Sequence, residues 1–330
     1  MNLSRNALHD CLSDRVLQLI VMPTEACNFR CVYCYQDFAY GKMEASVVTG
    51  IKNLLSRRAS TLLKLTLSWF GGEPLLANDI IEDILGYARG LTRQNPDLHL
   101  FSDITTNGYR LSRPLFERLL DLGVSLYQIP LDGPPEWHDK KRVLMSGRGT
   151  FQVIWNNLLA MREVGKDFTI LMRLHVDREN YAALPGFIED YRRVFGDDRR
   201  FKLFPRRISL LGGPNDATLP VFEDGAGRKA EAALRRLAAH QQIDHILAND
   251  LTPICYAARA NSFIVRANGR LNKCTIALED PVNQVGRLEE DGHLKLEVPK
   301  LHGWMRGLVS GDAAELECPM HGYCHGSPSG

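Results

Sequence analysis

The sequence has almost no net charge, no long apolar run near its start and no signal peptide. Its 330 residues include 40 basic and 39 acidic side chains, so no net electric field favours nucleic acid or an anionic membrane as a partner. The apolar run at residues 16–22 is far shorter than the ~20 residues of a membrane-spanning helix. Arg5, Asp10, Asp14 and Arg15 are unlike a signal peptide. We therefore expect a cytoplasmic protein that binds neither nucleic acid nor membrane.

Cysteine is missing from the long stretch between Cys34 and Cys255, and most of the eight cysteines gather in two groups. Cysteines clustered in a chain of this kind are expected to bind metal rather than to form disulfides. Cys11 stands apart from both groups, and we interpret it as structural. At this length and with 45% hydrophobic residues, the chain can bury one large core or two smaller ones.

Three cysteines, Cys27, Cys31 and Cys34, occur within eight residues, soon after the apolar run 16–22. Thiolates hold iron–sulfur clusters, and a cubane normally takes four of them. Three closely spaced thiolates therefore indicate a cluster with one iron left open, able to bind and activate another molecule. The alternatives are a chance run of buried cysteines and a zinc knuckle, although a structural zinc needs a fourth ligand that the nearby sequence does not offer.

The Cys27-x3-Cys31-x2-Cys34 spacing, with the aromatic Tyr33 before the third cysteine, resembles the defining motif of the radical S-adenosylmethionine (radical SAM) enzymes. The resemblance implies a [4Fe–4S] cluster on the three thiolates, with the amino and carboxylate groups of SAM on the open iron. It also implies cleavage of SAM to methionine and a 5′-deoxyadenosyl radical, which takes a hydrogen atom from the substrate. We assign Tyr33 to the SAM site on the same basis.

Strands and helices alternate along the first two thirds of the chain. Buried strands are expected at 16–22, 63–69, 98–104, 124–131, 168–176 and 201–204, with helical spacing of apolar residues between them. Six such units predict an α/β fold that resembles the family's partial (β/α)6 TIM barrel, open on one side for a large substrate. We place this barrel at residues 1–235 and a small α+β module at residues 236–330. A helix is also expected at 228–247.

Glycine and polar residues follow the second and third expected strands. Glycines at a strand end let the backbone approach a ligand closely, although Gly71-Gly72-Glu73-Pro74 could also be a turn. Together with the cysteine motif it resembles the family's GGE motif, which implies that Gly71, Gly72 and Glu73 bind the SAM amino group. Asn107, in Thr-Thr-Asn-Gly after the third strand, resembles the family's TNG strand end; an ordinary Asn-Gly turn is the alternative.

The segment after the fourth expected strand resembles the SLDGP…HDxxR segment of radical SAM peptide and protein maturases. Pro130 stands where that pattern usually has serine, and it offers neither a hydroxyl nor an N–H donor. Gln128, two residues earlier, points to the same face of a strand. We therefore assign the polar contact to SAM to Gln128.

Three further ionisable residues have competing interpretations. Asp132 and His138 are interpreted as loop-capping groups rather than acid–base catalysts. Arg173 lies inside the fifth expected strand, where a charged side chain is unusual. It is either part of a barrel ion pair or a clamp on the SAM carboxylate, which suits guanidinium geometry. Arg206 and Arg207 could contact substrate or form a solvated rim.

The last quarter of the chain contains Cys255, Cys274, Cys318 and Cys324. Cys255-x13-Gly269-x4-Cys274 resembles the opening of the SPASM and twitch domains, which bind auxiliary iron–sulfur clusters. Residues 262–267 and 270–274 are expected to form a β-hairpin around Asn268-Gly269. Glu315 and Pro328 occupy two positions that are cysteine in a full SPASM domain, so we predict one auxiliary [4Fe–4S] cluster in a reduced module. A structural zinc on the same cysteines and a ligand among His302, His321 and His325 are the alternatives.

The resemblance covers nearly the whole chain and is greatest to maturases of ribosomally synthesised peptides. We expect the enzyme to install a cross-link in a precursor peptide, either carbon–carbon (cyclophane type) or thioether, with the auxiliary cluster accepting the surplus electron. Peptide epimerases need a non-cluster cysteine, and only Cys11 is spare. A sulfatase-maturing enzyme would need more auxiliary-cluster cysteines. Other peptide oxidation and a small-molecule dehydrogenase remain open, whereas an iron–sulfur electron carrier would leave the SAM motifs without a purpose.

The expected partners are a precursor peptide and a reductant such as a flavodoxin or ferredoxin. Only 26 residues precede Cys27, too few for the N-terminal leader-binding domain of some maturases. Leader recognition is therefore expected at the barrel's open side or on a separate protein. No residue can be assigned from the sequence as the catalytic base.

Overall fold

A computed structural model of the chain describes residues 5–223, 225–241, 243 and 254–320. Six strands and the helices between them form its larger part. The strands are β1 (Val16–Val21), β2 (Lys64–Trp69), β3 (His99–Thr105), β4 (Val124–Leu131), β5 (Thr169–Val176) and β6 (Phe201–Arg207). The helices are α1 (Arg5–Leu12), α2 (Ala45–Arg58), α3 (Asn78–Gln94), α4 (Arg113–Asp121), α5 (Pro135–Lys141), α6 (Phe151–Arg162), α7 (Leu184–Phe195) and α8 (Ala226–His240).

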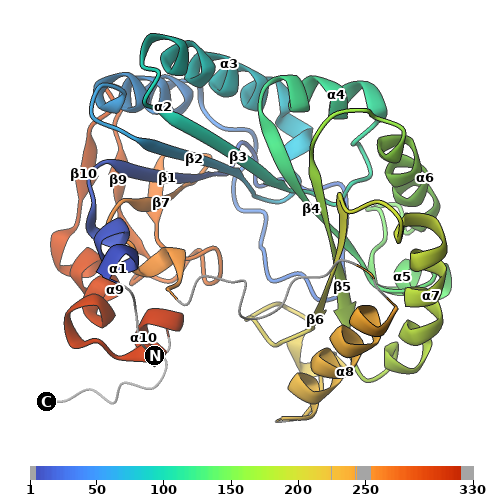
Figure 1. Cartoon of the computed structure of the whole chain (residues 1–330). Coiled ribbons are helices and arrows are strands. Elements are labelled where there is room, and N and C mark those ends of the chain that lie inside the picture. The colour runs from blue at the N-terminus through green and yellow to red at the C-terminus, as the bar shows by residue number, and fades with distance from the viewer. Residues whose placement is uncertain (1–4, 224, 242, 244–253, 321–330) are drawn as a thin grey trace, which may run out of the picture.

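The six strands pair in parallel and in chain order, from β1 to β6. Helices α2, α3, α4, α6 and α7 cover the outer side of this curved sheet (Figure 1). The expected (β/α)6 partial barrel is confirmed, and its strand boundaries differ from the prediction by three residues at most. The expected helix at 228–247 forms as α8 up to His240, and its last residues, 244–247, lie outside the described part of the chain.

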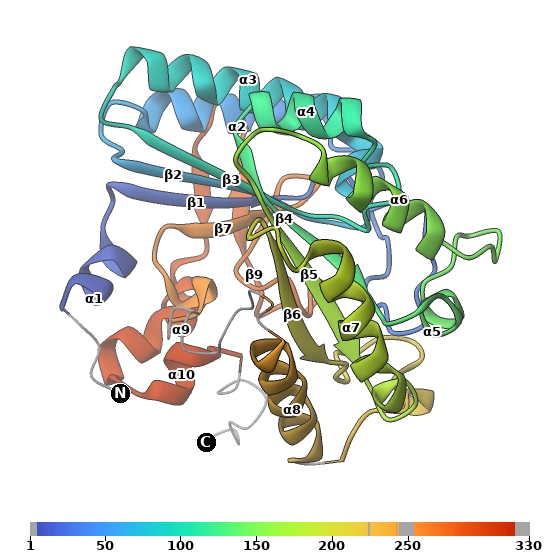
Figure 2. The same ribbon diagram turned by 45° about the vertical axis from the view of Figure 1, so that its right-hand side comes forward.

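The sheet continues beyond the barrel into the C-terminal part of the chain. Strand β7 (Ser262–Val265) pairs in parallel with β1, and β8 (Arg270–Asn272), β9 (Gln284–Leu288) and β10 (Leu294–Leu296) follow as antiparallel neighbours. The expected hairpin is therefore present as β7 and β8, and it also extends the barrel sheet at the β1 edge (Figure 2). Helices α9 (Val298–Ser310) and α10 (Ala313–Glu317) complete this part. The division at residue 235 stays a prediction.

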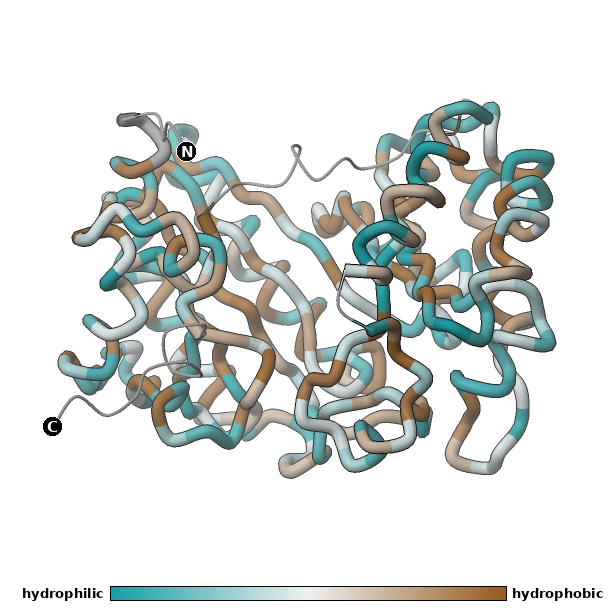
Figure 3. The backbone as a smooth tube through the Cα atoms, turned by 90° about the horizontal axis from the view of Figure 1, so that it is seen from below, coloured by the Kyte–Doolittle hydropathy of each residue, from teal (hydrophilic) through white to brown (hydrophobic). Residues whose placement is uncertain are grey.

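Apolar side chains fill the space between the sheet and the outer helices. In β1, Leu17, Leu19 and Val21 are fully buried and join one large core that also takes in the inner faces of the helices. Seen from below, the helices alternate between hydrophilic and hydrophobic residues along their turns, as amphipathic helices do (Figure 3). None of the helices in the described ranges is long and apolar enough to cross a bilayer.

A carboxylate from α5, and not the N-cap side chain, caps the start of α6. Thr150 is the N-cap residue, but its side chain does not cap the helix. Instead the carboxylate of Asp139 accepts hydrogen bonds from the N–H groups of Thr150 and Phe151, at 2.7 and 2.9 Å. The Thr150 hydroxyl turns inward and donates to the carbonyl of Arg142. This arrangement ties the start of α6 to the end of α5.

Candidate functional site

The cysteine loop follows β1 and is held against the segment after α5. Backbone hydrogen bonds join Arg30 to Val143 (2.8 Å) and Val32 to Lys141 (3.0 Å). Cys27, Cys31 and Cys34 all line one pocket of about 280 Å³ at the carboxyl ends of the strands. No group of three His, Cys, Asp or Glu side chains in the described ranges has the geometry for a single metal ion. Ligands of one zinc ion must each lie about 2.3 Å from it, whereas a four-iron cluster keeps its thiolates farther apart.

Burial controls the protonation of the three thiols in the metal-free chain. It raises the pKa of Cys27 to about 12 and that of Cys31 to about 11, and it raises the pKa of Cys34 as well. The Cys27 sulfur also accepts a hydrogen bond from the N–H of Phe29, at 3.4 Å. These thiols are protonated at neutral pH, so a metal that binds them must displace their protons.

The two glycines after β2 pack directly against the backbone of the cysteine loop. Gly71 has a φ of +126°, and a Cβ atom there would lie 2.2 Å from the carbonyl oxygen of Thr24. A Cβ on Gly72 would lie 2.4 Å from the carbonyl oxygens of both Glu25 and Ala26. Only glycine fits such close backbone approaches. Both glycines also line the pocket, and their contact with SAM stays a prediction.

Glu73 is fully buried, and its carboxylate is committed to neighbouring groups. It accepts hydrogen bonds from the N–H of Leu75 (3.0 Å), the hydroxyl of Thr106 (2.7 Å) and the N–H of Asn107 (2.7 Å). Burial raises the pKa of Glu73 in spite of these bonds. The side chain thus ties the end of β2 to the end of β3, and its contact with SAM stays a prediction.

Asn107 and Gln128, which were both assigned to SAM, occupy different places. Asn107 lines the pocket, and its amide donates to the side-chain oxygen of Asn28 in the cysteine loop, at 2.9 Å. Gln128 is outside the lining, and its amide lies 3.4 Å from the Thr105 hydroxyl. Pro130 takes the place at the pocket wall on that strand. The assignment of Gln128 to SAM stays a prediction.

Tyr33 is the centre of a buried polar network. Its hydroxyl lies 2.8 Å from a carboxylate oxygen of Asp132 and 3.0 Å from Nδ1 of His175, and it accepts a hydrogen bond from Arg142 at 2.7 Å. Burial alone would raise the pKa of Asp132, but His175 and Arg142 hold it well below its usual range. Burial lowers the pKa of His175 to about 4. The network therefore holds an aspartate, a neutral histidine and an arginine beside the cysteine loop.

His138 is fully buried, and it caps the loop as predicted. Its Nδ1 lies 3.3 Å from the backbone N–H of Asp132, and its Nε2 lies 3.0 Å from the Thr150 hydroxyl. Burial lowers the pKa of His138 to about 4. His138 is thus a neutral bridge between two loops. The predicted capping role of Asp132 is not seen among the described residues, where its carboxylate contacts the side chains of Tyr33 and His175 instead of a backbone N–H group.

Among the residues that the structure describes, Arg173 forms no ion pair, which one interpretation required. It lines the pocket, and its Nε atom is buried with no hydrogen-bond partner among the described residues. Burial lowers the pKa of Arg173. A buried guanidinium nitrogen without a partner is costly, so the site fits an anionic ligand such as a carboxylate.

The described C-terminal cysteines lie outside the pocket lining, but the loop after Cys274 reaches the pocket wall. Cys255 and Cys274 are half-buried and Cys318 is exposed. Burial is the largest cause of the raised pKa values of Cys255 and Cys274, and the nearby thiol of Cys318 raises both of these pKa values further. Cys324 lies outside the described residues, as do His321 and His325. Ile276, just after Cys274, forms part of the pocket wall. The C-terminal loop therefore completes the pocket.

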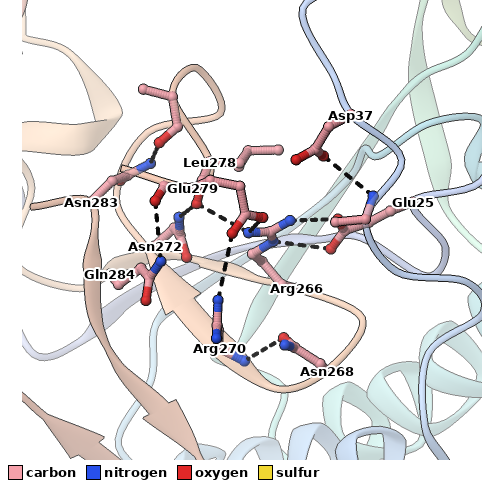
Figure 4. Close-up of polar contacts among 12 residues, drawn as sticks. Glu25, Asp37, Arg266, Asn268, Arg270, Asn272, Leu278, Glu279, Asn283 and Gln284 are labelled. Atoms are coloured by element: carbon pink, nitrogen blue, oxygen red, sulfur yellow. Dashed lines mark hydrogen bonds and ion pairs between the residues drawn. The ribbon is translucent and has the colours of Figure 1, made fainter. Parts of the chain in front are cut away.

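A buried ion pair joins that C-terminal loop to the cysteine loop (Figure 4). Arg266, at the end of β7, donates two hydrogen bonds to the carboxylate of Glu25, at 2.6 and 3.0 Å. It also donates to the carbonyl of Leu278 (3.0 Å) and to the side chain of Glu279. Glu25 lies two residues before Cys27. Arg266 thus fixes the position of the cysteine loop relative to the C-terminal part.

Sequence reasoning left the roles of three pocket residues unassigned. His175 and Tyr35 line the pocket beside Arg142, and burial raises the pKa of Tyr35 to about 12. His175 is two residues after Arg173 along β5, so the two side chains face the same side of the strand. This spacing could have placed His175 in the pocket from the sequence. Cys11 is buried in a separate cluster with Ile254, Ala258 and Leu316, consistent with a structural role.

Comparison with known proteins identifies the family. A model described as the radical SAM superfamily matches residues 21–190, just over half of the chain. A cysteine-type anaerobic sulfatase-maturating enzyme of Clostridium novyi (strain NT) is 26% identical over 211 residues, which is 61% of this chain and 54% of the relative. The chain spans about half the length of the curated relatives it matches.

Two solved structures share the fold. Native anSMEcpe, solved with AdoMet and the Kp18Cys peptide, has a TM-score of 0.68 and 17% identity, covering 89% of this chain and 83% of that chain. SuiB of Streptococcus suis, bound to precursor peptide SuiA, has a TM-score of 0.62 and 14% identity, covering 89% and 67%. The described architecture is therefore one that radical SAM enzymes adopt.

Proposed function

The chain belongs to the radical SAM superfamily, and on that premise we propose that this enzyme installs a cross-link in a ribosomally synthesised precursor peptide. The proposal rests above all on one observation: the three cysteines Cys27, Cys31 and Cys34 share a pocket with two closely packed glycines and with an arginine whose buried Nε lacks a partner.

The residues of this pocket fit a [4Fe–4S] cluster and SAM. Cys27, Cys31 and Cys34 would hold the cluster and leave one iron open for SAM. The backbone at Gly71 and Gly72 would approach the SAM amino group, and Arg173 would bind the SAM carboxylate. Tyr33, Glu73, Asn107 and Gln128 complete the proposed SAM site. When bound, the two groups supply a 5′-deoxyadenosyl radical that removes a hydrogen atom from the substrate.

The surrounding residues of the chain keep this site in place. Tyr33 lies between Cys31 and Cys34 in the sequence, and its hydroxyl is hydrogen-bonded to Arg142 and His175. These bonds restrict the conformations of the cysteine loop. Glu73 braces the two strand ends that carry the glycines and Asn107. Hydrogen bonds thus join the loops that form the pocket, as a site that positions reacting groups requires.

A peptide is the substrate that the comparisons favour. Both fold neighbours described above were solved with peptides bound. Among described residues, the cysteines that line the pocket are the three of the motif, and Cys11 is buried elsewhere. An epimerase would need another thiol at the pocket to return a hydrogen atom. A cross-link, either carbon–carbon or thioether, needs none.

We also propose one auxiliary [4Fe–4S] cluster on Cys255, Cys274, Cys318 and Cys324, in a twitch-like module at residues 236–330. The mutual proximity of the first three supports a shared ligand, and zinc is the rival occupant. The cluster would accept the electron left over when the new bond forms. A flavodoxin or ferredoxin would supply the starting electron, and a separate protein could bind the leader peptide.

The proposal is tested by SAM cleavage under anaerobic, reducing conditions. We expect the reconstituted enzyme to release 5′-deoxyadenosine, and a variant with Cys27, Cys31 and Cys34 all changed to Ala to release none. The matched control is Cys11→Ala, which should retain the activity. When a precursor peptide is supplied, mass spectrometry should show a product that has lost two hydrogen atoms. An unchanged yield of 5′-deoxyadenosine in the triple variant would refute the radical SAM assignment.

A further inference from the structure

Four arginines line the pocket, and the described part of the chain contributes no acidic side chain to its wall. Arg142, Arg173, Arg206 and Arg207 belong to its wall, and neither aspartate nor glutamate appears among the described residues that line it. A surplus of positive charge in a concave site attracts an anionic ligand. An arginine that neither the chain nor SAM neutralises would be free to bind such a ligand.

Two of the four have protein partners. Arg142 donates to Tyr33 within the buried network around Asp132, and its pKa is raised well above its usual range: burial lowers it, but the acidic groups around Arg142 raise it more. Arg207 lies 3.6 Å from the carboxylate of Glu231 on α8. The carboxylate of SAM is the proposed partner of the third, Arg173. SAM offers one carboxylate, so it cannot also neutralise a fourth arginine.

Arg206 is the cation that remains. It lies at the carboxyl end of β6, where its backbone pairs with β5, and it is exposed. No hydrogen bond or ion pair joins its side chain to another residue in the described ranges. It is close enough to Arg173 to lower that residue's pKa, although burial is the larger cause. Ile208, Ser209 and Leu211 line the wall beside it. An unpaired guanidinium is therefore presented to the pocket next to apolar and hydroxyl surface.

We propose that Arg206 binds a carboxylate of the peptide substrate, from an aspartate or glutamate close to the residue that loses hydrogen. This inference rests on the proposed function and names a feature of its substrate. A guanidinium binds a carboxylate through two parallel hydrogen bonds. A single unmatched cation fits one carboxylate, whereas a triphosphate would need several cations. Ile208 and Leu211 offer apolar surface to the aliphatic part of the aspartate or glutamate side chain.

The test measures protection of Arg206 from phenylglyoxal, which modifies arginine, in SAM-saturated holoenzyme. The probes are N-acetyl-aspartate N-methylamide, its asparagine analogue and inorganic triphosphate, and peptide mass mapping follows each arginine. We expect the aspartate probe to slow modification of Arg206 and the asparagine analogue to leave it unchanged. Arg199, which is exposed and lies before the opposite end of β6, should be unaffected. Equal rates with both amides, or protection by triphosphate alone, would overturn the proposal.

A matched pair of variants gives a second readout. In Arg206→Gln we expect the aspartate probe to bind about tenfold more weakly, the effect of losing one charge-assisted hydrogen bond, and in Arg199→Gln we expect no change. SAM affinity reports folding and should be that of the wild type in both. Loss of SAM binding in Arg206→Gln would overturn the proposal, because Arg206 would then belong to the SAM site. SAM cleavage without peptide tests the proposed function separately.

Discussion

Replacing Arg266 with methionine should destabilise the chain strongly. The Arg266 side chain is 0% exposed and that of its partner Glu25 only 2%. Methionine fills part of the space but leaves the Glu25 carboxylate buried without a cation, and the Leu278 carbonyl keeps only the hydrogen bond from Asn272. Removing one partner of a buried ion pair costs roughly 3–5 kcal/mol in the free energy of unfolding. That is a large part of the roughly 5–15 kcal/mol that holds a typical domain together.

A double variant separates the lost charge pair from lost packing. In Glu25→Leu/Arg266→Met no unpaired buried charge remains at position 25, so we expect most of the lost stability to return. The measurement is the urea midpoint of iron-free protein, followed by tryptophan fluorescence. Arg287→Met is the control, because Arg287 on β9 is exposed and its loss should change stability by less than about 0.5 kcal/mol. If Arg266→Met unfolds at the same urea concentration as Arg287→Met, the ion pair does not stabilise the fold as argued.

Three further predictions concern the pocket and the opposite end of the barrel. Gly72→Ala should displace the cysteine loop and lower iron retention after desalting, because its Cβ would meet two carbonyl oxygens at 2.4 Å; Gly86→Ala, with nothing within 4 Å, is the control and should retain full iron. Asp132→Asn should lower the free energy of unfolding by roughly 3–5 kcal/mol, because Arg142 loses its buried carboxylate neighbour; an unchanged urea midpoint would contradict this. Burial raises the pKa of Asp103 to about 6, above the usual range of an aspartate. The folded state therefore holds this proton more tightly than the unfolded state, so stability should fall by on the order of 1–2 kcal/mol as pH rises from about 4 to about 6. Asp103→Asn should abolish this slope in urea midpoints measured across that range.

The sequence was sufficient to predict the barrel because each unit has its own local signal. Apolar runs of strand length, helical spacing and glycine at element ends recur six times, and parallel pairing in chain order follows from that alternation. It did not predict that β7 would join β1, because strand pairing between residues 18 and 262 has no local signature. Register between distant segments depends on tertiary packing, which a single sequence does not show.

Site residues could be predicted where a sequence motif identified them. Their hydrogen-bond partners could not be predicted, because those contacts form only in the folded structure. The cysteines and the two glycines occupy the same pocket, as expected from their spacing and from their place at strand ends. Glu73 and Asp132 were recognised as important, but their hydrogen bonds to Thr106 and to Tyr33 cross between loops and could not be deduced. The ion pair between Arg266 and Glu25 spans most of the chain, and only the folded structure brings the two together.

The most direct test of the central claim is an iron and sulfide count with EPR on anaerobically reconstituted protein. Wild type should hold about eight irons, and the variant with Cys27, Cys31 and Cys34 changed to Ala should hold about four, if each cluster has four irons. Four irons falling to none would leave the C-terminal cysteines to zinc or to a structural role, and would remove the auxiliary electron acceptor from the proposal. An iron content that is the same in both proteins would contradict the claim that these three thiols hold the radical SAM cluster.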